Sequence, residues 1–220
     1  MFIASVETNY LMFARIQNFF WLLYFLYIQR IKGLTPPGDE PYMPDAEIAR
    51  FKDEISKASH YVEFGSGGST VYASRLGIET ISVENDPYYA RVVAQRLLNG
   101  SVKQIIVHMG ITGEWGIPIY PNVHRARAYV TAPWNDESFP QFILVDGRYR
   151  VACALESARR AYLCGCRTTL MFDDYVDRVY YHEIEKLLGR PEIVGRAAIF
   201  VIGKEKVLET EVERWLLDPG

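Results

Sequence analysis

Short apolar runs alternate along this chain with longer segments in which apolar residues recur at helical spacing. The first pattern predicts strands, at residues 61–64, 80–83, 104–108, 142–145, 168–172 and 197–202. The second pattern predicts helices, at residues 45–59, 70–76, 87–98, 151–163, 176–188 and 207–217. Strands that alternate with helices indicate crossover connections between parallel strands. The sequence therefore predicts an α/β fold, with a doubly wound, mostly parallel sheet flanked by helices.

The residues that follow each predicted strand are the candidates for function. A doubly wound sheet binds its ligands beyond the carboxyl ends of its strands, near the point where the strand order reverses. The segment 112–140 separates two predicted strands and contains four prolines and two tryptophans. We expect it to form a wall or lid over that edge. At the start of the first helix, Asp45 is placed to act as the N-cap.

The first 44 residues depart from the alternating pattern. Residues 10–28 are mostly apolar and aromatic, whereas residues 33–44 contain four prolines and two glycines, which exclude a regular element. We therefore expect an extra N-terminal aromatic helix within residues 1–32, a linker at residues 33–44 and a main domain at residues 45–220.

The aromatic segment has two interpretations. Its uninterrupted apolar run, residues 19–28, is shorter than the roughly 20 residues that cross a bilayer. In one interpretation the helix lies on a membrane surface, with Arg30 and Lys32 at the headgroups. In the other it packs on the main domain or on a second copy of the chain. Peripheral membrane contact and a homodimer through residues 10–28 both stay open.

Composition narrows the class of protein. Hydrophobic residues make up 49% of the chain and charged residues 23%, as in folded globular proteins. The net charge of −3, without a basic block, argues against nucleic acid as a partner. With three cysteines we expect no disulfide framework and a reducing, cytoplasmic setting, and Cys164 and Cys166 would supply only half of a zinc site. His108 is expected in the core and His182 on a helix surface, neither with a catalytic role.

The stretch YVEFGSGGST, residues 61–70, places three glycines where a strand meets a helix. Glycines let the backbone approach a ligand closely. The dinucleotide fingerprint would need a glycine where Thr70 stands and does not include the acid at Glu63. Without a clear Tyr-x-x-x-Lys set either, a nicotinamide-dependent oxidoreductase is disfavoured. Glu84 ends the next predicted strand, about 20 residues further on, where a carboxylate accepts hydrogen bonds from ribose hydroxyls.

Three motifs carry a resemblance to a known family. E-x-G-x-G-G from Glu63, S-V-E ending at Glu84 and L-V-D-G-R at residues 144–148 resemble class I S-adenosylmethionine-dependent methyltransferases, over about residues 45–204. The runs GITGEWGIP, LVDGRYRVACAL, FDDY and GRAAIFVI are similar to a bacterial group of methyltransferase-like proteins of unassigned substrate. Ser69 departs from the family pattern, because the last glycine of the motif normally falls there. The region after the fifth strand leaves little room for the usual long terminal hairpin.

The resemblance implies a Rossmann-like S-adenosylmethionine-dependent methyltransferase that acts on a small-molecule or glycan-like acceptor, at an oxygen atom. Glu63 would support the amino-acid end of the cofactor, Glu84 would bind its ribose, and Asp146 would face the methyl group and the acceptor. The implied cofactor-binding residues are Glu63, Gly65, Ser66, Gly67, Gly68, Ser69, Glu84, Asn85, Gly110, Ile111 and Asp146. The alternative is a non-catalytic binding or membrane-associated assembly protein that keeps the cofactor fold.

Three carboxylates follow the fourth and fifth predicted strands, namely Asp146, Asp173 and Asp174. They are the candidate catalytic residues, and three roles stay open for them. They act as a base or orient the acceptor, or they hold Mg²⁺ as oxygen ligands. In the third role they are structural, with Asp173 or Asp174 capping the next helix and Asp146 paired with Arg148 or Arg150.

Overall fold

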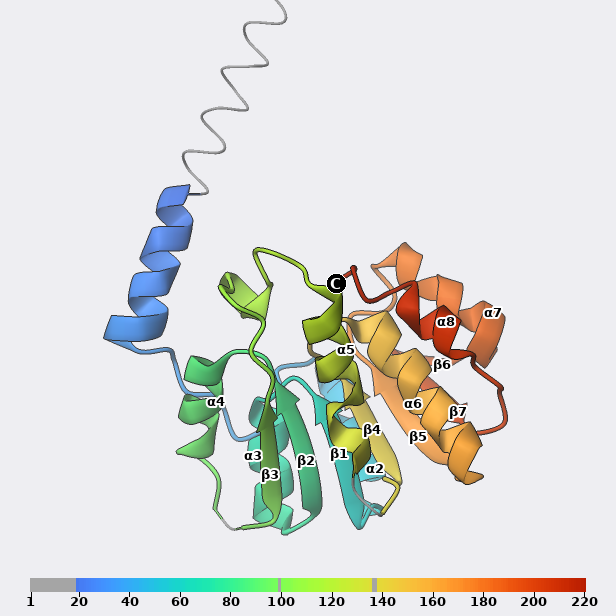
Figure 1. Ribbon diagram of the computed structural model, residues 1–220. Helices are drawn as coiled ribbons and strands as arrows, with labels where there is room; N and C mark the ends of the chain where they lie inside the picture. Colours follow the sequence, from blue (N-terminus) through green and yellow to red (C-terminus); the bar gives the residue numbers. More distant parts are fainter. Residues whose placement is uncertain (1–18, 99, 136–137) are drawn as a thin grey trace, which may run out of the picture.

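The predicted doubly wound sheet lies at the centre of the protein (Figure 1). The structure is a computed structural model and describes residues 19–98, 100–135 and 138–220. Within these residues, seven strands follow the order β3-β2-β1-β4-β5-β7-β6. They are β1 (His60–Phe64), β2 (Glu79–Glu84), β3 (Val102–Ile106), β4 (Phe142–Val145), β5 (Thr168–Phe172), β6 (Glu192–Val194) and β7 (Ala197–Ile202). The first five strands are parallel and β7 is antiparallel to its neighbours, which confirms a mostly parallel α/β fold.

Helices cover both faces of this sheet. They are α2 (Asp45–Ser56), α3 (Gly68–Leu76), α4 (Pro87–Ala94), α5 (Val123–Thr131), α6 (Arg150–Cys164), α7 (Glu185–Leu188) and α8 (Glu209–Glu213). Residues of α2 and α3 join one hydrophobic core with one face of the central strands. Residues of α5, α6 and α8 join a second core with the opposite face. The layers are therefore helix, sheet and helix, as crossover connections require.

Strand β4 shows why the short apolar runs become buried strands. Successive side chains of a strand point to opposite faces of the sheet. Phe142 and Leu144 belong to the core under α2 and α3, whereas Ile143 and Val145 belong to the core under α5 and α6. All four are at most 1% exposed. Because both faces are covered, every position of the strand is apolar and the pattern shows no alternation.

The predictions for the helices at residues 45–59 and 176–188 need correction. Asp45 is the first residue of α2 rather than its N-cap, and the N-cap position makes no side-chain hydrogen bond. The helix predicted at residues 176–188 is a 3₁₀ helix (Val179–Ile184) followed by the single turn of α7. Tyr181 and Ile184, both buried, stand three positions apart. That spacing suits the three residues per turn of a 3₁₀ helix.

Two elements were missing from the predictions. The segment 112–140 contains α5, whose buried residues Ala126, Tyr129 and Val130 face the core, so part of the expected lid belongs to the body of the fold. Strand β6 pairs with β7 in a short antiparallel hairpin, where little room for a hairpin was expected. The last predicted helix, residues 207–217, is shortened to α8. Interleaved arginines in α5 hid an apolar spacing that is otherwise helical.

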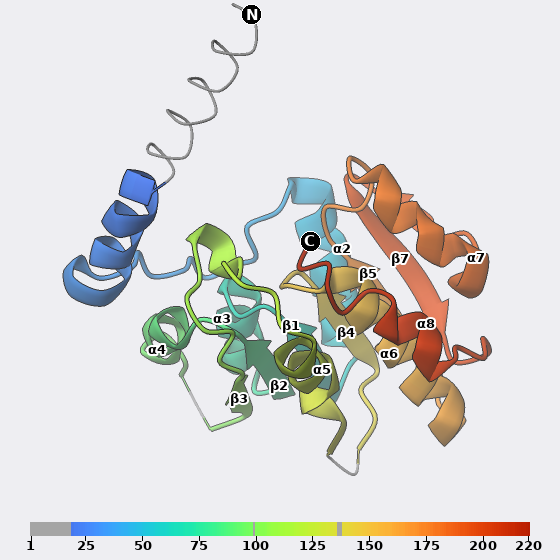
Figure 2. The same ribbon diagram turned by 45° about the horizontal axis from the view of Figure 1, so that its top comes forward.

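The N-terminal segment is helical over residues 19–27 and continues as a π-helix, Ile28–Lys32. Residues 10–18 of the predicted aromatic segment lie outside the described residues. Residues 33–44 form no regular element, and Met43 packs into the core beside α2. Among the described helices, none has both the length and the apolar content that crossing a bilayer requires. Figure 2 shows the N-terminal helix standing beside the sheet domain.

Cys164 and Cys166 form a disulfide at the end of α6. No disulfide framework was expected, and this single pair was not predicted. Gly165 between them ends α6 in the left-handed conformation, with φ +69°. This turn brings the two Cα atoms within 5.3 Å of each other. Cys153 is a free, buried cysteine.

Candidate functional site

The strand order reverses between β1 and β4, and the loops that follow these two strands meet there. Gly65 opens the glycine loop (Gly65–Gly68) with φ +97°. A Cβ on it would lie 2.8 Å from the Cα of Gly147 and 2.9 Å from the carbonyl oxygen of Asp146. A Cβ on Gly147 would overlap the hydroxyl of Tyr129. Because both positions lack a side chain, Asp146 lies directly beside the glycine loop.

Glu63 holds the glycine loop from inside the protein. It is fully buried, and its carboxylate accepts hydrogen bonds from Ser69 Oγ at 2.6 Å, from the Tyr61 hydroxyl at 2.9 Å and from the Thr70 hydroxyl. Burial raises the pKa of Glu63, and the hydroxyl donors oppose that rise. Since its oxygens are turned to the loop's own hydroxyls, any support that Glu63 gives to a ligand passes through the loop.

The departures from known glycine motifs have structural reasons. Thr70, which stands where the dinucleotide fingerprint needs glycine, accepts a hydrogen bond from the N–H of Gly67 at 2.8 Å. Gly68 begins α3, and a Cβ there would overlap the backbone carbonyl of Glu40, so the linker crosses the loop at this point. At Gly67 the nearest atom to a Cβ is the hydroxyl of Tyr89, 4.0 Å away. The open side of the loop is therefore at Gly67.

Glu84, at the end of β2, is tied to the glycine loop by its carboxylate. Its Oε2 accepts a hydrogen bond from the N–H of Ser66 at 3.0 Å, and its Oε1 accepts from the N–H groups of Asn85 at 2.7 Å and Asp86 at 2.9 Å. Burial raises the pKa of Glu84 from 4.5 to about 7, against the lowering effect of these backbone donors. A carboxylate offers about four acceptor positions. One position on Oε2 is therefore left for a ligand.

The other predicted cofactor residues lie where the loop after β3 meets the end of β2. Asn85 is buried and its amide donates to the carbonyl of Gly116 at 2.5 Å, so its side chain holds that loop in place. Gly110 is exposed and has φ +89°, and the guanidinium of Arg125 packs against it. Ile111 is solvent-exposed. The structure thus brings Asn85 and Gly110 to the same edge and leaves Ile111 on the surface.

Tyr89 lies in the middle of this edge, although the sequence gave no role to it. It belongs to the first turn of α4, and its hydroxyl stands over Gly67. Burial, followed by the nearby carboxylates of Glu84, Asp146 and Glu63, raises the pKa of Tyr89 to about 12. The sequence signal that could have identified Tyr89 is its place in the helix that follows the strand-end acid Glu84.

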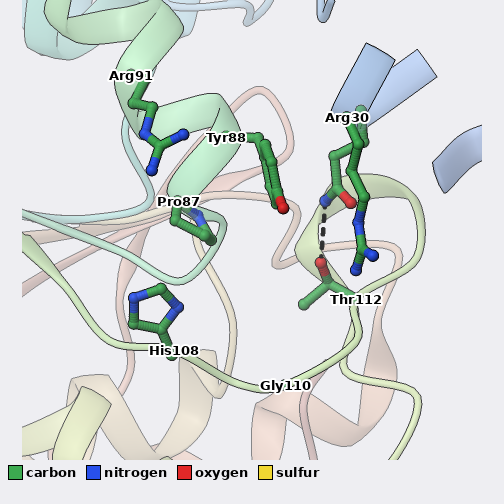
Figure 3. Close-up of a pocket in the computed structure, with 8 residues that line it drawn as sticks. Arg30, Pro87, Tyr88, Arg91, His108, Gly110 and Thr112 are labelled. Carbon is green, nitrogen blue, oxygen red and sulfur yellow. Dashed lines mark hydrogen bonds between the residues drawn. The ribbon is translucent and has the colours of Figure 1, made fainter. Parts of the chain in front are cut away.

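His108 was expected in the core, and the structure corrects this. It is exposed and lines a pocket of about 220 Å³ together with Arg30, Tyr88 and Arg91 (Figure 3). The error came from the predicted strand at residues 104–108, because β3 ends two residues earlier and His108 belongs to the loop that follows it.

The carboxylates after β4 and β5 come together, and arginines hold them. Asp146, Asp173 and Asp174 offer oxygens that lie within 4.8 Å of one another. The guanidinium of Arg150 lies 2.9 Å from Asp146 and 3.1 Å from Asp174. That of Arg196 lies 3.3 Å from Asp173 and 3.1 Å from Asp174. One structural role expected for Asp146, an ion pair with Arg150, is therefore present.

Two other predictions about structural roles of these acids are wrong. Arg148 does not pair with Asp146 and instead donates to the carbonyl of Gly220 at 3.2 Å. Neither Asp173 nor Asp174, the acids after β5, caps a helix. Asp174 has a left-handed backbone conformation with φ +55°, and the chain turns there instead of entering a helix. The next helical turn begins only at Val179, and no side chain caps it.

Asp146 is the most open of the three acids, with 35% of its side chain exposed against 3% for Asp173. The protein that encloses its carboxyl on the inner side raises the pKa of Asp146 well above its usual range, Arg150 opposes this rise, and Asp173 adds to it. The donor set does not fit a divalent cation, because two guanidinium groups already hold the oxygens that such an ion needs.

Solved structures with the same architecture include a methyltransferase-like protein from Silicibacter pomeroyi DSS-3. It is 34% identical to this chain with a TM-score of 0.73, and the match covers 84% of this chain and 99% of that one. Cofactor-bound Rv0187 from MTB is 15% identical with a TM-score of 0.50, covering 76% of this chain and 84% of that one, a likeness that shows the fold alone. No family model and no curated protein matches the chain.

Proposed function

We propose that this chain, which belongs to the family of methyltransferase-like proteins, is an S-adenosylmethionine-dependent methyltransferase that acts at an oxygen atom of a small-molecule or glycan-like acceptor. The observation that carries this proposal is the junction of the glycine loop with Glu84 at the edge where the strand order reverses. The hydrogen bond from Ser66 to Glu84 fixes that junction, and doubly wound sheets bind their ligands at such an edge.

The residues at this junction fit a nucleoside that carries an amino-acid arm. The free acceptor position on Glu84 Oε2 suits a ribose hydroxyl. Gly67 has no side chain and leaves space between the loop and the hydroxyl of Tyr89, so a ligand arm could pass close to the backbone there. Asn85 and Gly110 would border the adenine, on the far side of Glu84. The loop also departs from the diphosphate-binding fingerprint at Thr70, whose hydroxyl accepts the hydrogen bond of the Gly67 N–H.

For methyl transfer the protein must mainly align the methyl donor with the acceptor and deprotonate the acceptor. The cofactor, when bound, supplies a methyl group on a sulfonium centre. Asp146 stands beside the glycine loop at the end of β4 and is partly open to solvent. Its raised pKa makes it a stronger proton acceptor than an ordinary aspartate. We assign to Asp146 the role of taking the acceptor's proton, with Arg150 holding the carboxylate in place.

A second candidate function has one observation in its favour. The ion pairs of Asp146, Asp173 and Asp174 with Arg150 and Arg196 give all three acids a purely structural explanation. A binding protein that keeps the cofactor fold without catalysis would need nothing more from them. The two candidates differ in what the carboxylate of Asp146 does, and that difference is measurable.

Calorimetry with S-adenosylhomocysteine, the product of methyl transfer, tests cofactor use. We expect the protein to bind this product and not NAD⁺. Gly67→Val fills the open side of the loop at a position without a positive φ, so it is expected to weaken binding by about tenfold or more. Gly100→Val, also at an open position but far from the loop, is the matched control. A protein that shows no heat of binding at millimolar product refutes the proposal.

Transfer of a labelled methyl group to a pool of hydroxylated metabolites tests catalysis. Asp146→Asn keeps the shape of the side chain and removes its proton-accepting charge. An enzyme is expected to keep its affinity for S-adenosylhomocysteine in this variant and to lose most of its label transfer. If the wild-type protein binds the cofactor product tightly and transfers no label to any pool, the non-catalytic candidate is the correct one.

A further inference from the structure

The N-terminal helix exposes most of its aromatic residues. Only a narrow face, with Phe25 and Gln29 four positions apart, is buried against the domain. Gln29 fixes that contact through hydrogen bonds from its Nε2 to Asp86 at 2.6 Å and to Thr112 at 3.2 Å. Leu22, Leu26 and Ile28 are half-buried. Six large apolar side chains are each at least 46% exposed, namely Phe19, Phe20, Trp21, Leu23, Tyr24 and Tyr27. The helix therefore exposes a larger aromatic surface to solvent than an ordinary surface helix does.

A second exposed apolar surface lies beside this helix, on the loop of residues 111–120. Trp115 is 78% exposed and Tyr120 is 75% exposed. The loop is held in shape by backbone hydrogen bonds between its two arms and by the amide of Asn85. Trp115 itself has φ +58°, a left-handed conformation that costs free energy for a bulky residue. A strained backbone that keeps a tryptophan in water indicates a binding role.

A cationic pocket separates the two apolar surfaces. Arg30 comes from the helix, Arg91 from α4 and His108 from the loop after β3. Figure 3 shows the two arginines on opposite sides of Tyr88, and each guanidinium carbon lies 5.7 Å from the centre of that ring. Within the part of the chain that the structure describes, neither arginine has a carboxylate partner, although most other arginines do. Two guanidinium groups and an imidazole around a concave space are suited to a phosphate.

We propose that this face of the protein docks on an anionic phospholipid surface, with a headgroup phosphate in the pocket between Arg30, Arg91 and His108. Aromatic side chains favour the boundary between headgroups and acyl chains, and nearby basic residues add attraction to anionic lipids. The helix and the loop 111–120 rise on the same side of the molecule in both views, the side of the strands' carboxyl ends (Figures 1 and 2). Docking therefore turns the candidate functional edge toward the membrane.

The charge of the pocket favours a lipid surface over a second copy of the chain. A two-fold contact through this face would place the same patch on both sides of the interface. Arg30 and Arg91 of one copy would then approach the arginines of the other, without acids to neutralise them. The phosphates of a membrane supply the missing negative charge. This inference does not depend on the proposed methyl transfer, and its test uses no cofactor.

Flotation of the full chain with lipid vesicles tests the docking. We expect it to float with vesicles of phosphatidylcholine and phosphatidylglycerol in a 7:3 ratio and to float weakly with phosphatidylcholine alone. Salt should weaken the first interaction, because it screens the arginines. The double variant Arg30→Gln and Arg91→Gln is expected to reduce partitioning onto anionic vesicles about tenfold. Trp115→Ala should reduce partitioning onto both kinds of vesicle.

The double variant Arg190→Gln and Arg214→Gln is the matched control, since it removes the same charge from exposed arginines near α7 and α8. Thermal unfolding midpoints equal to that of the wild type show that the variants fold. Equal binding to neutral and anionic vesicles, or an equal loss in the control, overturns the proposal. So does binding of inorganic phosphate without flotation, which would mark a site for a soluble anion. Sedimentation showing a dimer that Trp115→Ala dissolves, without flotation, would assign the surface to a second copy.

Discussion

Glu63 and Glu84 lie near the ends of β1 and β2, on the glycine-loop side of the sheet, and accept hydrogen bonds from hydroxyl and backbone N–H groups. Asp146 and Asp174 follow β4 and β5, on the other side, and are held by arginines. On the first side the donors are neutral, so the negative charge of each carboxylate is not cancelled. On the second side Arg150 alone lies within 3.1 Å of both aspartates. The two halves of one edge therefore hold their carboxylates with different partners, neutral donors on one side and guanidinium groups on the other.

This difference indicates what each half can do. Glu84 is a buried carboxylate with neutral donors, and its pKa is raised because burial disfavours the charged form. It also keeps a free acceptor position, so a ligand that donates a hydrogen bond there stabilises the charged carboxylate. A carboxylate paired with a buried guanidinium is held in one position by that partner, and Arg150 also opposes the rise that burial causes in the pKa of Asp146. The glycine-loop side is therefore suited to holding a neutral polyol such as ribose. The arginine side is suited to holding a catalytic carboxylate in a fixed position.

The largest effect is expected from breaking the arginine side. Arg150→Met leaves Asp146 and Asp174 without their shared cation and also removes hydrogen bonds to the backbone carbonyls of Gly147 and Asp173. The free energy of unfolding should fall by about 3–5 kcal/mol, because two buried backbone carbonyls lose a charged donor, at about 1.5–3 kcal/mol for each hydrogen bond. Urea denaturation followed by circular dichroism measures this loss.

Arg190→Met is the matched control, because that arginine is exposed beyond α7. It should change the free energy of unfolding by no more than about 0.5 kcal/mol. Adding Asp146→Asn to Arg150→Met removes one of the stranded charges and should recover part of the loss. If Arg150→Met unfolds at the same urea concentration as the control, the arginines do not hold this side of the edge together.

A smaller loss is expected from the hydroxyl-bound side. Thr70→Val removes one donor to Glu63 and the acceptor of the Gly67 N–H, and both groups lie against protein. We expect the free energy of unfolding to fall by about 2 kcal/mol, since two neutral hydrogen bonds are lost and the partners stay buried. Thr70→Ser keeps the hydroxyl and should recover most of that loss. A Thr70→Ser protein as unstable as Thr70→Val would mean that packing of the methyl group, not the hydroxyl, matters here.

The positions of most strands and the layers of the fold could be predicted because the apolar runs are local signals. The residues of β4, β5 and β7 match the predicted ranges residue for residue, since strands buried on both faces are apolar at every position. The 3₁₀ helix at Val179–Ile184 and the capping of α2 could not be predicted, because they depend on how single turns pack against the rest of the protein.

The candidate site residues could be chosen by their place at or just after the ends of strands, but their hydrogen-bond and ion-pair partners could not be predicted. The sequence places Glu63 before the glycines, and nothing in the pattern shows that Ser69 and Thr70 turn back to it. Arg196 lies 23 positions from Asp173, and only the antiparallel return of β7 next to β5 brings the two together. Contacts of this kind follow from the strand order, so they become visible only after the fold is known.

The smallest and most specific effect is expected from the pH dependence of cofactor-product binding. Glu84 has a pKa of about 7 in the free protein, and a ribose hydroxyl can donate to its Oε2 only after the proton has left. The affinity for S-adenosylhomocysteine should therefore rise with pH and level off above 7, with binding at pH 6 weaker by about tenfold, or about 1.4 kcal/mol. Glu84→Gln has no proton to lose, so its affinity should be lower and should stay flat across this range.

Calorimetry at pH 6, 7 and 8 on both proteins measures the two profiles. A wild-type profile as flat as that of Glu84→Gln would show that the free position on Glu84 does not receive the ligand, and the contrast between the two halves of the edge would then have no bearing on binding.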